Sequence, residues 1–464
     1  MSLALGPTLL ALQDGEQYRF VFDMTACIGC HSCEVACAEQ NNLPVEVAWR
    51  RVGEVEGGQF PQTRRFNLSM ACNHCLEPTC LEGCPTGAYV KLDNGVVEHD
   101  ADDCIGCQYC TWNCPYSVPV FHAARKIVTK CDMCLPRLEQ GSTSACVDAC
   151  PTHAIGIEIV NVAAWRLDHS AADGPNLPSS DITISTPRIV LPDDLPLETF
   201  AASDHDVRPE HPHWPLVVVT LLMQLAAGTM GAIAIVGGDR SASVTAFVAA
   251  AISLPVSLFH LGRPILAWKA IRGIRRSWLS REVVAFSTFA AMSMVPVLWP
   301  TRLGATAAAF VGAVGVYCSG RLYVVRGRPA WDTPLTVVAF FLTGIAVGPL
   351  LAMSVMGTDG WLQTVAVTGI GAQLTVLVVG ANRLRRNPAR EWHGSYRLLT
   401  QRFGPLLRLR VGLAMLGAVL VIVGPAWLAL VLVAGGELIG RYLFFVTVVA
   451  LNMPGTFSRP GSLR

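Results

Sequence analysis

Acidic residues are scarce in the second half of the chain. Residues 213–464 hold 6 Asp/Glu beside 22 Lys/Arg, a net charge of +16, whereas residues 1–212 hold 28 Asp/Glu and 13 Lys/Arg, a net charge of −15. Two halves of such opposite charge exclude a single soluble globule. The basic residues lie between long apolar runs rather than on a soluble face, which argues against a nucleic-acid-binding protein.

Cysteine is equally uneven, because 16 of the 17 cysteines lie in the first half. They form four groups that each end in C-x3-C, and three of the groups are followed by proline. The groups are Cys27, Cys30, Cys33 and Cys37; Cys72, Cys75, Cys80 and Cys84; Cys104, Cys107, Cys110 and Cys114; and Cys131, Cys134, Cys146 and Cys150. This is the bacterial ferredoxin pattern, in which three closely spaced thiolates bind one cubane and the fourth binds the neighbouring cluster. The groups therefore work in pairs, and the sequence predicts four 4Fe–4S clusters.

Two other uses of these cysteines fit less well. Zinc sites use pairs of cysteines separated by a loop rather than four tight quartets. A disulfide framework needs an oxidising compartment, and the first residues predict no export signal. Between the second and third groups, alternating residues around Asp93-Asn94-Gly95 predict a tight hairpin. Residues 1–159 are therefore expected to form an α+β polyferredoxin domain of two paired bacterial-ferredoxin-like units.

A linker rich in Pro, Asp and Ser follows at residues 160–212. Such a composition is typical either of an extended strap or of a disordered tether. The β-branched residues of ITISTPRIVLP favour an ordered strap that lies on a partner or on the ferredoxin domain.

Long apolar runs begin at residue 213, and each is long enough to cross a bilayer, which takes about 20 residues. They predict an all-α bundle of eight transmembrane helices in residues 213–464, a membrane anchor. The spans lie near 214–237, 242–262, 282–300, 303–325, 333–356, 361–383, 409–425 and 427–451. The alternative for 409–451 is one re-entrant or kinked segment.

Lysine and arginine predict the orientation of the anchor. The loops and helix ends on the side of the ferredoxin domain carry 19 of them, and the opposite loops carry 2. Because cytoplasmic loops are enriched in Lys and Arg, the ferredoxin domain is expected to face the cytoplasm from the inner (cytoplasmic) membrane.

Histidine is nearly absent from the predicted spans, where only His260 occurs. One histidine cannot supply a bis-His haem, so we expect no haem and direct electron transfer between a quinone and a cluster. Ionisable residues at membrane depth are candidate functional residues, and quinone chemistry needs a proton donor or acceptor beside each carbonyl. The candidate quinone residues are His260, Arg263, Glu282, Arg321 and Tyr323. The alternative is an interfacial belt of basic and aromatic residues. Glu437 and Arg441, four residues apart, are predicted to form a structural ion pair.

The cysteine groups resemble the iron–sulfur subunit of the dimethyl sulfoxide reductase family of molybdenum enzymes. SLFHLGRPILAW at 257–268, RPAWDTPLT at 328–336 and GELIGRYLFF at 436–445 resemble the anchor subunit of that family. The resemblance implies an eight-helix anchor without haem and with a quinone pocket around His260. It also implies four ligand sets, in order from the catalytic partner to the membrane: Cys27, Cys30, Cys33 and Cys150; Cys131, Cys134, Cys146 and Cys37; Cys72, Cys75, Cys80 and Cys114; and Cys104, Cys107, Cys110 and Cys84.

The sequence therefore predicts a fused electron-transfer and quinone-reactive subunit without a catalytic centre of its own. Its expected partners are a separate molybdopterin-containing catalytic subunit, the membrane lipid and ubiquinone or menaquinone. The expected cytoplasmic position of the ferredoxin domain favours, by analogy, a sulfite:quinone oxidoreductase. A menaquinol-driven dimethyl sulfoxide or N-oxide reductase is the alternative. A membrane-tethered polyferredoxin hub without quinone chemistry is an alternative of another class.

Overall fold

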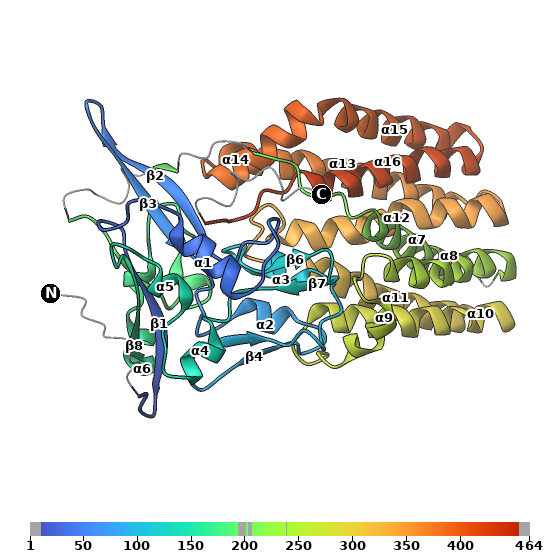
Figure 1. The fold of residues 1–464 in the computed structure, drawn as a ribbon. Helices are drawn as coiled ribbons and strands as arrows, with labels where there is room; N and C mark the ends of the chain where they lie inside the picture. Colours follow the sequence, from blue (N-terminus) through green and yellow to red (C-terminus); the bar gives the residue numbers. More distant parts are fainter. Residues whose placement is uncertain (1–10, 194–200, 203–206, 238, 454–464) are drawn as a thin grey trace. The chain divides into compact units, whose positions relative to one another are not determined.

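The computed structural model describes residues 11–193, 201–202, 207–237 and 239–453, so the two ends of the predicted domains, residues 1–10 and 454–464, lie outside it. The chain divides into two compact units (Figure 1). The first contains the described residues up to 202 together with 450–453, and the second contains 207–449. The observed boundary thus precedes the predicted start of the anchor at residue 213. Residues 207–212 join the second unit, where Glu210 forms a 3.0 Å ion pair with Arg328.

A three-stranded sheet organises the first unit. Its central strand β1 (Glu16–Asp23) pairs antiparallel with β8 (Ile155–Asn161) and parallel with β9 (Arg188–Val190). Phe20, Phe22 and Ile157 of this sheet are buried in the core of the unit. The sheet thereby joins the start of the cysteine region to its end.

An ion-pair cluster ties the three strands together. Glu158 on β8 accepts two hydrogen bonds from the Arg188 guanidinium, of 2.7 and 2.6 Å, and one of 2.7 Å from Arg19 Nε. Burial alone would raise the pKa of Glu158, but the hydrogen bonds of Arg188 and the charge of Arg19 outweigh it and lower the pKa. The carboxylate therefore stabilises the sheet in its charged form.

Three hairpins complete the strands of the first unit. β2 (Arg51–Gln59) and β3 (Gln62–Met70) form a long hairpin, and β10 (Ala201–Ala202) pairs with the free edge of β2. β4 (Tyr89–Lys91) and β5 (Val97–His99) form the hairpin that was predicted around Asp93-Asn94-Gly95, with Gly95 at φ 88°. β6 (Val120–His122) and β7 (Ile127–Thr129) form its counterpart after the third cysteine group.

Short helices carry many of the cysteines. They are α1 (Ser32–Gln40), α2 (Thr79–Gly83), α3 (Tyr109–Asn113), α4 (Leu135–Glu139), α5 (Ala145–Asp148) and α6 (Val162–Leu167). Cys84 and Cys114 stand at the C-terminal caps of α2 and α3, so the last thiol of each group leaves its helix at the same point. The unit is α+β, as predicted.

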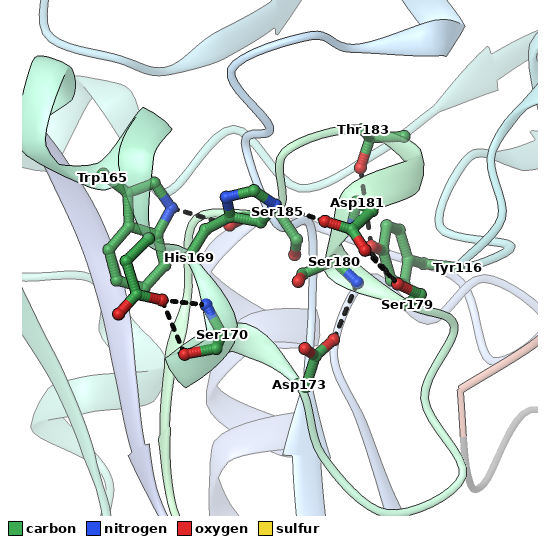
Figure 2. Close-up of polar contacts among 11 residues, drawn as sticks. Tyr116, Trp165, His169, Ser170, Asp173, Ser179, Ser180, Asp181, Thr183 and Ser185 are labelled. Atoms are coloured by element: carbon green, nitrogen blue, oxygen red, sulfur yellow. Dashed lines mark hydrogen bonds and ion pairs between the residues drawn. The ribbon is translucent and has the colours of Figure 1, made fainter.

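The described part of the linker is ordered on the first unit. It contains α6, two 3-10 turns, η1 (Ser170–Ala172) and η2 (Ser180–Ile182), and strand β9. Ile189 is buried in the core of the unit, and Trp165 Nε1 donates a 2.9 Å hydrogen bond to the Ser185 carbonyl (Figure 2). Of the two interpretations of residues 160–193, the strap is the one observed.

The second unit consists of helices, and eight of those in its described residues are long and apolar enough to cross a membrane. They are α7 (Trp214–Val236), α8 (Arg240–Leu258), α9–α10 (Trp278–Leu298, with α9 ending at Ser293 and α10 covering Val295–Leu298), α11 (Arg302–Leu322), α12 (Pro334–Met356), α13 (Gly360–Arg386), α15 (Gly404–Val423) and α16 (Ala426–Val446). Between them lie η4 (Pro264–Ile271), α14 (Arg390–Arg397) and η5 (Leu398–Arg402). The predicted number of spans is confirmed, and residues 409–451 contain two helices rather than one kinked segment.

Glycine allows the closest helix contact in the bundle. A Cβ at Gly228 of α7 would lie 2.1 Å from the Gly344 carbonyl oxygen of α12, and one at Gly348 would lie 2.2 Å from the Gly228 carbonyl carbon. Small residues at a helix interface permit such backbone approach in membrane bundles. The backbones of α7 and α12 are therefore in direct contact.

Candidate cluster sites and quinone site

One cavity of the first unit is lined by the four cysteines of the first predicted set. Cys27, Cys30, Cys33 and Cys150 line it together with Ser69 and Thr152. Gly29, within the C-I-G-C turn, lies in the left-handed region at φ 68°, and a Cβ there would lie 2.7 Å from the Asn67 side-chain oxygen. Glycine thus lets the loop turn beside this cavity.

A second cavity is lined by Cys72, Cys75, Cys80 and Cys114, the third predicted set. Cys80 comes from α2, and Cys114 follows α3 directly. A cysteine from the next group in the sequence therefore completes the set, as the ferredoxin pattern requires.

The fourth predicted set gathers around Cys110. Burial and the neighbouring Cys107 raise the pKa of the Cys110 thiol, and Cys104 and Cys84 act in the same direction. Here Cys84 of the second group joins three cysteines of the third. The second and third groups therefore each give their last cysteine to the other group's set.

The second predicted set gathers around Cys37. Burial, followed by Cys146, raises the pKa of the Cys37 thiol to about 12, and Cys134 adds to the shift. Burial, followed by Cys37, raises the pKa of Cys131. The structure thus brings together the members of each predicted set. Within the described ranges, no three His, Cys, Asp or Glu side chains are arranged to hold a single metal ion.

A buried arginine tests whether these thiols fit an anionic cluster. Arg50 is only 3% exposed, and its Nε and Nη2 have no hydrogen-bond partner. Burial alone would lower the pKa of the guanidinium, but Cys146 and Cys33 outweigh it and raise the pKa. A buried cation is costly unless a negative group compensates it. Negatively charged thiolate-bound clusters would compensate Arg50, so the residues present fit that group.

Lys130 is a second buried cation among the cysteines. Its ammonium donates to the carbonyl oxygens of Val97 and Cys131, and its side chain lines the cavity of the third set. Burial alone would lower its pKa, but Cys72, Cys131 and Cys80 outweigh it and raise the pKa. Lys130 therefore lies between the second and third sets, as Arg50 lies between the first and second.

The strap supplies a hydrogen bond to one of the cysteines. Thr183 Oγ1 donates a 3.1 Å hydrogen bond to Cys75 Sγ. It also lies 3.5 Å from the Tyr116 hydroxyl (Figure 2). The sequence analysis missed Thr183, Arg50 and Lys130. Only the position of Lys130 directly before Cys131 could have pointed to one of them.

The candidate quinone residues lie on several different elements of the bundle. His260 follows α8, and its Nδ1 donates to the Ser257 carbonyl oxygen, so Nε2 of the neutral ring carries the lone pair. Arg263 directly precedes η4. Glu282 on α9 faces Ser319 of α11, and the Arg321 guanidinium lies 5.3 Å from the Trp278 ring. Glu282 and Trp278 both belong to α9, so Arg321 lies beside the helix that carries Glu282.

Tyr323 lies in a different environment. It is 2% exposed, and its ring contacts Trp331, Phe340, Phe444 and Phe445 at centroid distances of 5.3 to 5.5 Å. This aromatic cluster joins α12 and α16 to the end of α11. Tyr323 is therefore a core residue of the bundle here, and its proposed contact with a quinone has no support from its packing.

The predicted ion pair between Glu437 and Arg441 is wrong. Glu437 lies 3.4 Å from Arg410 of α15, whereas Arg441 Nη2 donates a 2.8 Å hydrogen bond to Gln224 of α7. The Arg441 guanidinium also stacks over the Phe340 ring at 3.8 Å, and it meets Glu437 only through the Thr343 hydroxyl, which accepts from Arg441 at 3.2 Å and donates to the carboxylate at 2.6 Å. Tertiary partners thus outweigh the pairing expected along the helix.

Both units of the chain match known protein families. Residues 209–446, just over half of the chain, match the DMSO reductase anchor subunit (DmsC), and residues 64–159 match a 4Fe-4S dicluster domain. Fold and cysteine sets thus define an iron–sulfur electron-transfer protein with a multi-pass membrane anchor. The chain belongs to the dimethyl sulfoxide reductase family of iron–sulfur and anchor subunits, here joined in one polypeptide.

The first unit is similar to single subunits of known oxidoreductases. It is 40% identical over 177 residues to a subunit of the anaerobic dimethyl sulfoxide reductase of Haemophilus influenzae, a match of 36% of this chain and 86% of that one. The corresponding subunit of the Escherichia coli enzyme is 37% identical over 183 residues, or 38% and 88% of the two chains. A subunit of the sulfite dehydrogenase of Allochromatium vinosum is 38% identical over 160 residues, or 30% and 67%.

Proposed function

We propose that the chain carries electrons between a separate molybdopterin-containing catalytic subunit and the quinone pool of the membrane. The four cysteine sets would hold four 4Fe–4S clusters, which would supply one-electron transfer between these two partners. The chain itself holds no substrate-converting centre and serves as the electron-transfer and quinone subunit of an oxidoreductase complex.

The observation that carries this proposal is the linear order of the four sets. Cys146 of the second set acts on the pKa of Cys33 in the first, and Cys72 of the third acts on that of Cys131 in the second. Tyr89 lies beside cysteines of both the fourth and the third sets. Each set therefore neighbours the next one, which is the arrangement that stepwise electron transfer needs.

The quinone is proposed to react near His260, without haem. A quinol must release two electrons and two protons. His260 Nε2 accepts one proton while Nδ1–H stays bound to the Ser257 carbonyl, and Glu282 is the candidate acceptor for the other. Arg263 and Arg321 would stabilise negative charge on the quinone oxygens. The reverse transfers serve quinone reduction.

The membrane placement is part of the proposal. The excess of Lys and Arg on one side of the bundle supports an inner-membrane location with the first unit in the cytoplasm. Electrons and protons would then be handled on one face, so turnover by this subunit should build no membrane potential. A potential generated in sealed proteoliposomes during turnover would contradict this placement.

Two substrates of the catalytic partner remain in competition. Cytoplasmic placement favours sulfite oxidation, and the similarity to a sulfite dehydrogenase subunit supports it. The dimethyl sulfoxide reductase relatives are matched over more of their length, which supports a menaquinol-driven S- or N-oxide reductase. Anaerobic addition of sulfite to the chain purified with its molybdenum partner separates them, because only a sulfite dehydrogenase would reduce its clusters in an EPR experiment.

Substitution of His260 tests the quinone role against a polyferredoxin hub. His260→Ala should abolish quinone-linked turnover while all four clusters remain assembled, because the first unit is unchanged. His122→Ala, on the β6–β7 hairpin, is the matched control and should retain turnover. Full quinone-linked turnover in His260→Ala would exclude this site, and an absence of quinone binding by the native chain would favour the hub.

A further inference from the structure

A cavity lies in the half of the bundle that the proposed quinone site does not use. It has a volume of about 180 Å³, is partly open to the surroundings, and lies among α12, α13, α14, α15 and α16. Figure 1 shows these helices alongside one another in the orange and red part of the chain. Its walls are mainly apolar and include Leu335, Ala339, Val376, Leu377, Leu443 and Phe444. A mainly apolar wall that carries a few polar side chains suits the headgroup of an amphiphilic small molecule.

Gln373 of α13 lies in the wall of this cavity and has an unmet acceptor. It is 7% exposed. Its Nε2 donates hydrogen bonds to Glu437 Oε2 at 2.8 Å and to Thr343 Oγ1 at 3.1 Å. Because an ionised carboxylate only accepts, the amide must turn its nitrogen toward Glu437. Oε1 is thereby left buried without a partner, and it needs a donor that the described residues do not supply.

Arg410 of α15 supplies donors to the same cavity. Its Nη2 lies 3.4 Å from Glu437 Oε1, so Arg410 and Gln373 flank one carboxylate from its two oxygens. Gly440 makes room for the guanidinium, because a Cβ there would lie 2.4 Å from Arg410 Cζ. The other N–H groups of Arg410 have no acceptor in the part of the chain that is described, and they remain available to a ligand.

We propose that this cavity binds the headgroup of a quinol, with Gln373 Oε1 accepting a hydrogen bond from one hydroxyl and the Arg410 guanidinium donating to the other oxygen. A quinol combines both roles with an apolar ring and tail. A phospholipid phosphate only accepts, so it would bond Arg410 alone, and a lipid would need a headgroup hydroxyl or ammonium to reach Gln373 Oε1. The experiment therefore includes phosphatidylglycerol as a competitor. The choice of a quinone as the ligand rests on the proposed function, but the site is separate from His260, which follows α8.

The experiment counts quinol sites on the full-length chain in lipid nanodiscs. Decylubiquinol is titrated anaerobically, and binding is followed by quenching of tryptophan fluorescence, since Trp331 and Trp392 line the cavity. The variants are Gln373→Leu, Gly440→Ala, which displaces the Arg410 guanidinium without removing its charge, and His260→Ala. Thr375→Ala, two residues from Gln373 and exposed on α13, is the matched control. EPR of the clusters checks that each variant is folded.

The proposal predicts two quinol sites per chain. Gln373→Leu and Gly440→Ala should each weaken one of them by at least tenfold, Thr375→Ala neither, and His260→Ala only the other. A single site that disappears with His260→Ala would overturn the cavity and leave the proposed function intact. Two sites in the His260→Ala variant would contradict the proposed quinone site alone. Displacement of decylubiquinol from the Gln373-dependent site by phosphatidylglycerol would identify a lipid site and refute the inference.

Discussion

Replacement of Arg50 by Met should lower the reduction potentials of the clusters beside it. Reduction adds an electron to an already anionic cluster, and a buried cation stabilises the reduced form. Contacts of 3.1 Å from Arg50 Nη1 to Ser69 Oγ and 3.3 Å from that oxygen to Cys33 Sγ place the guanidinium within about 6.4 Å of this thiol. At an effective dielectric constant of about 20, a unit charge at this distance contributes about 2.5 kcal/mol. For one electron this equals about 110 mV.

The assay is a potentiometric titration of the purified chain followed by EPR. Arg50→Met should shift the first cluster down by about 110 mV and the second cluster in the same direction, whereas Arg50→Lys should shift them much less, because it keeps the charge. Arg65→Met is the matched control, since Arg65 is 64% exposed and should leave all potentials unchanged. Fully assembled clusters with native potentials in Arg50→Met would refute the reasoning, because the buried charge would then have no effect on reduction.

Three further predictions concern other parts of the chain. Gly228→Ala should destabilise the bundle by about 1–3 kcal/mol and lower its thermal midpoint in detergent, because the added Cβ meets the Gly344 carbonyl oxygen at 2.1 Å; an unchanged midpoint would exclude this close contact. Glu158 should stabilise the first unit above the ordinary carboxyl pKa, and this contribution should disappear as the pH falls through its lowered folded-state pKa, so acid unfolding of Glu158→Gln should show less dependence on pH. Thr183→Val should lower the potential of the cluster at Cys75 in the same EPR titration, because it removes the 3.1 Å hydrogen bond to the sulfur, and Ser179→Ala on the same strap should not.

Local spacing explains why the four cysteine groups and the spans could be predicted, whereas the exchange of cysteines between groups was implied by the resemblance to the dimethyl sulfoxide reductase family. The separation between cysteines limits which thiols can reach one cluster, and apolar runs of about 20 residues have few folded alternatives to a membrane helix. The Asp93-Asn94-Gly95 hairpin belongs to the same class, because its turn depends on adjacent residues. These features needed no knowledge of tertiary contacts.

Tertiary contacts explain what the sequence could not predict. Arg50 reaches the cysteines from the position just before β2, and Thr183 reaches Cys75 across more than 100 residues. Helical spacing predicted an ion pair between Glu437 and Arg441. In the structure Glu437 pairs with Arg410 of another helix. Such contacts depend on how elements pack, which periodicity does not specify.

The contact of Tyr323 with a quinone stays a prediction. Tyr323 has the polar hydroxyl of a quinone ligand and stands at the end of a predicted span. In the structure its ring fills the centre of an aromatic cluster of α12 and α16. Its side chain therefore contributes to the bundle core, as large buried aromatic residues commonly do.

The central claim is that this chain connects its clusters to the quinone pool. The most direct test is the anaerobic addition of decylubiquinol, or of a menaquinol analogue, to the oxidised chain, followed by EPR of all four clusters. We expect the clusters of higher potential to become reduced in the native chain and to stay oxidised in His260→Ala. The contrary result would be clusters that dithionite reduces and that neither quinol reduces, although the potential of the quinol is below that of the clusters. It would show that the chain does not connect its clusters to the quinone pool.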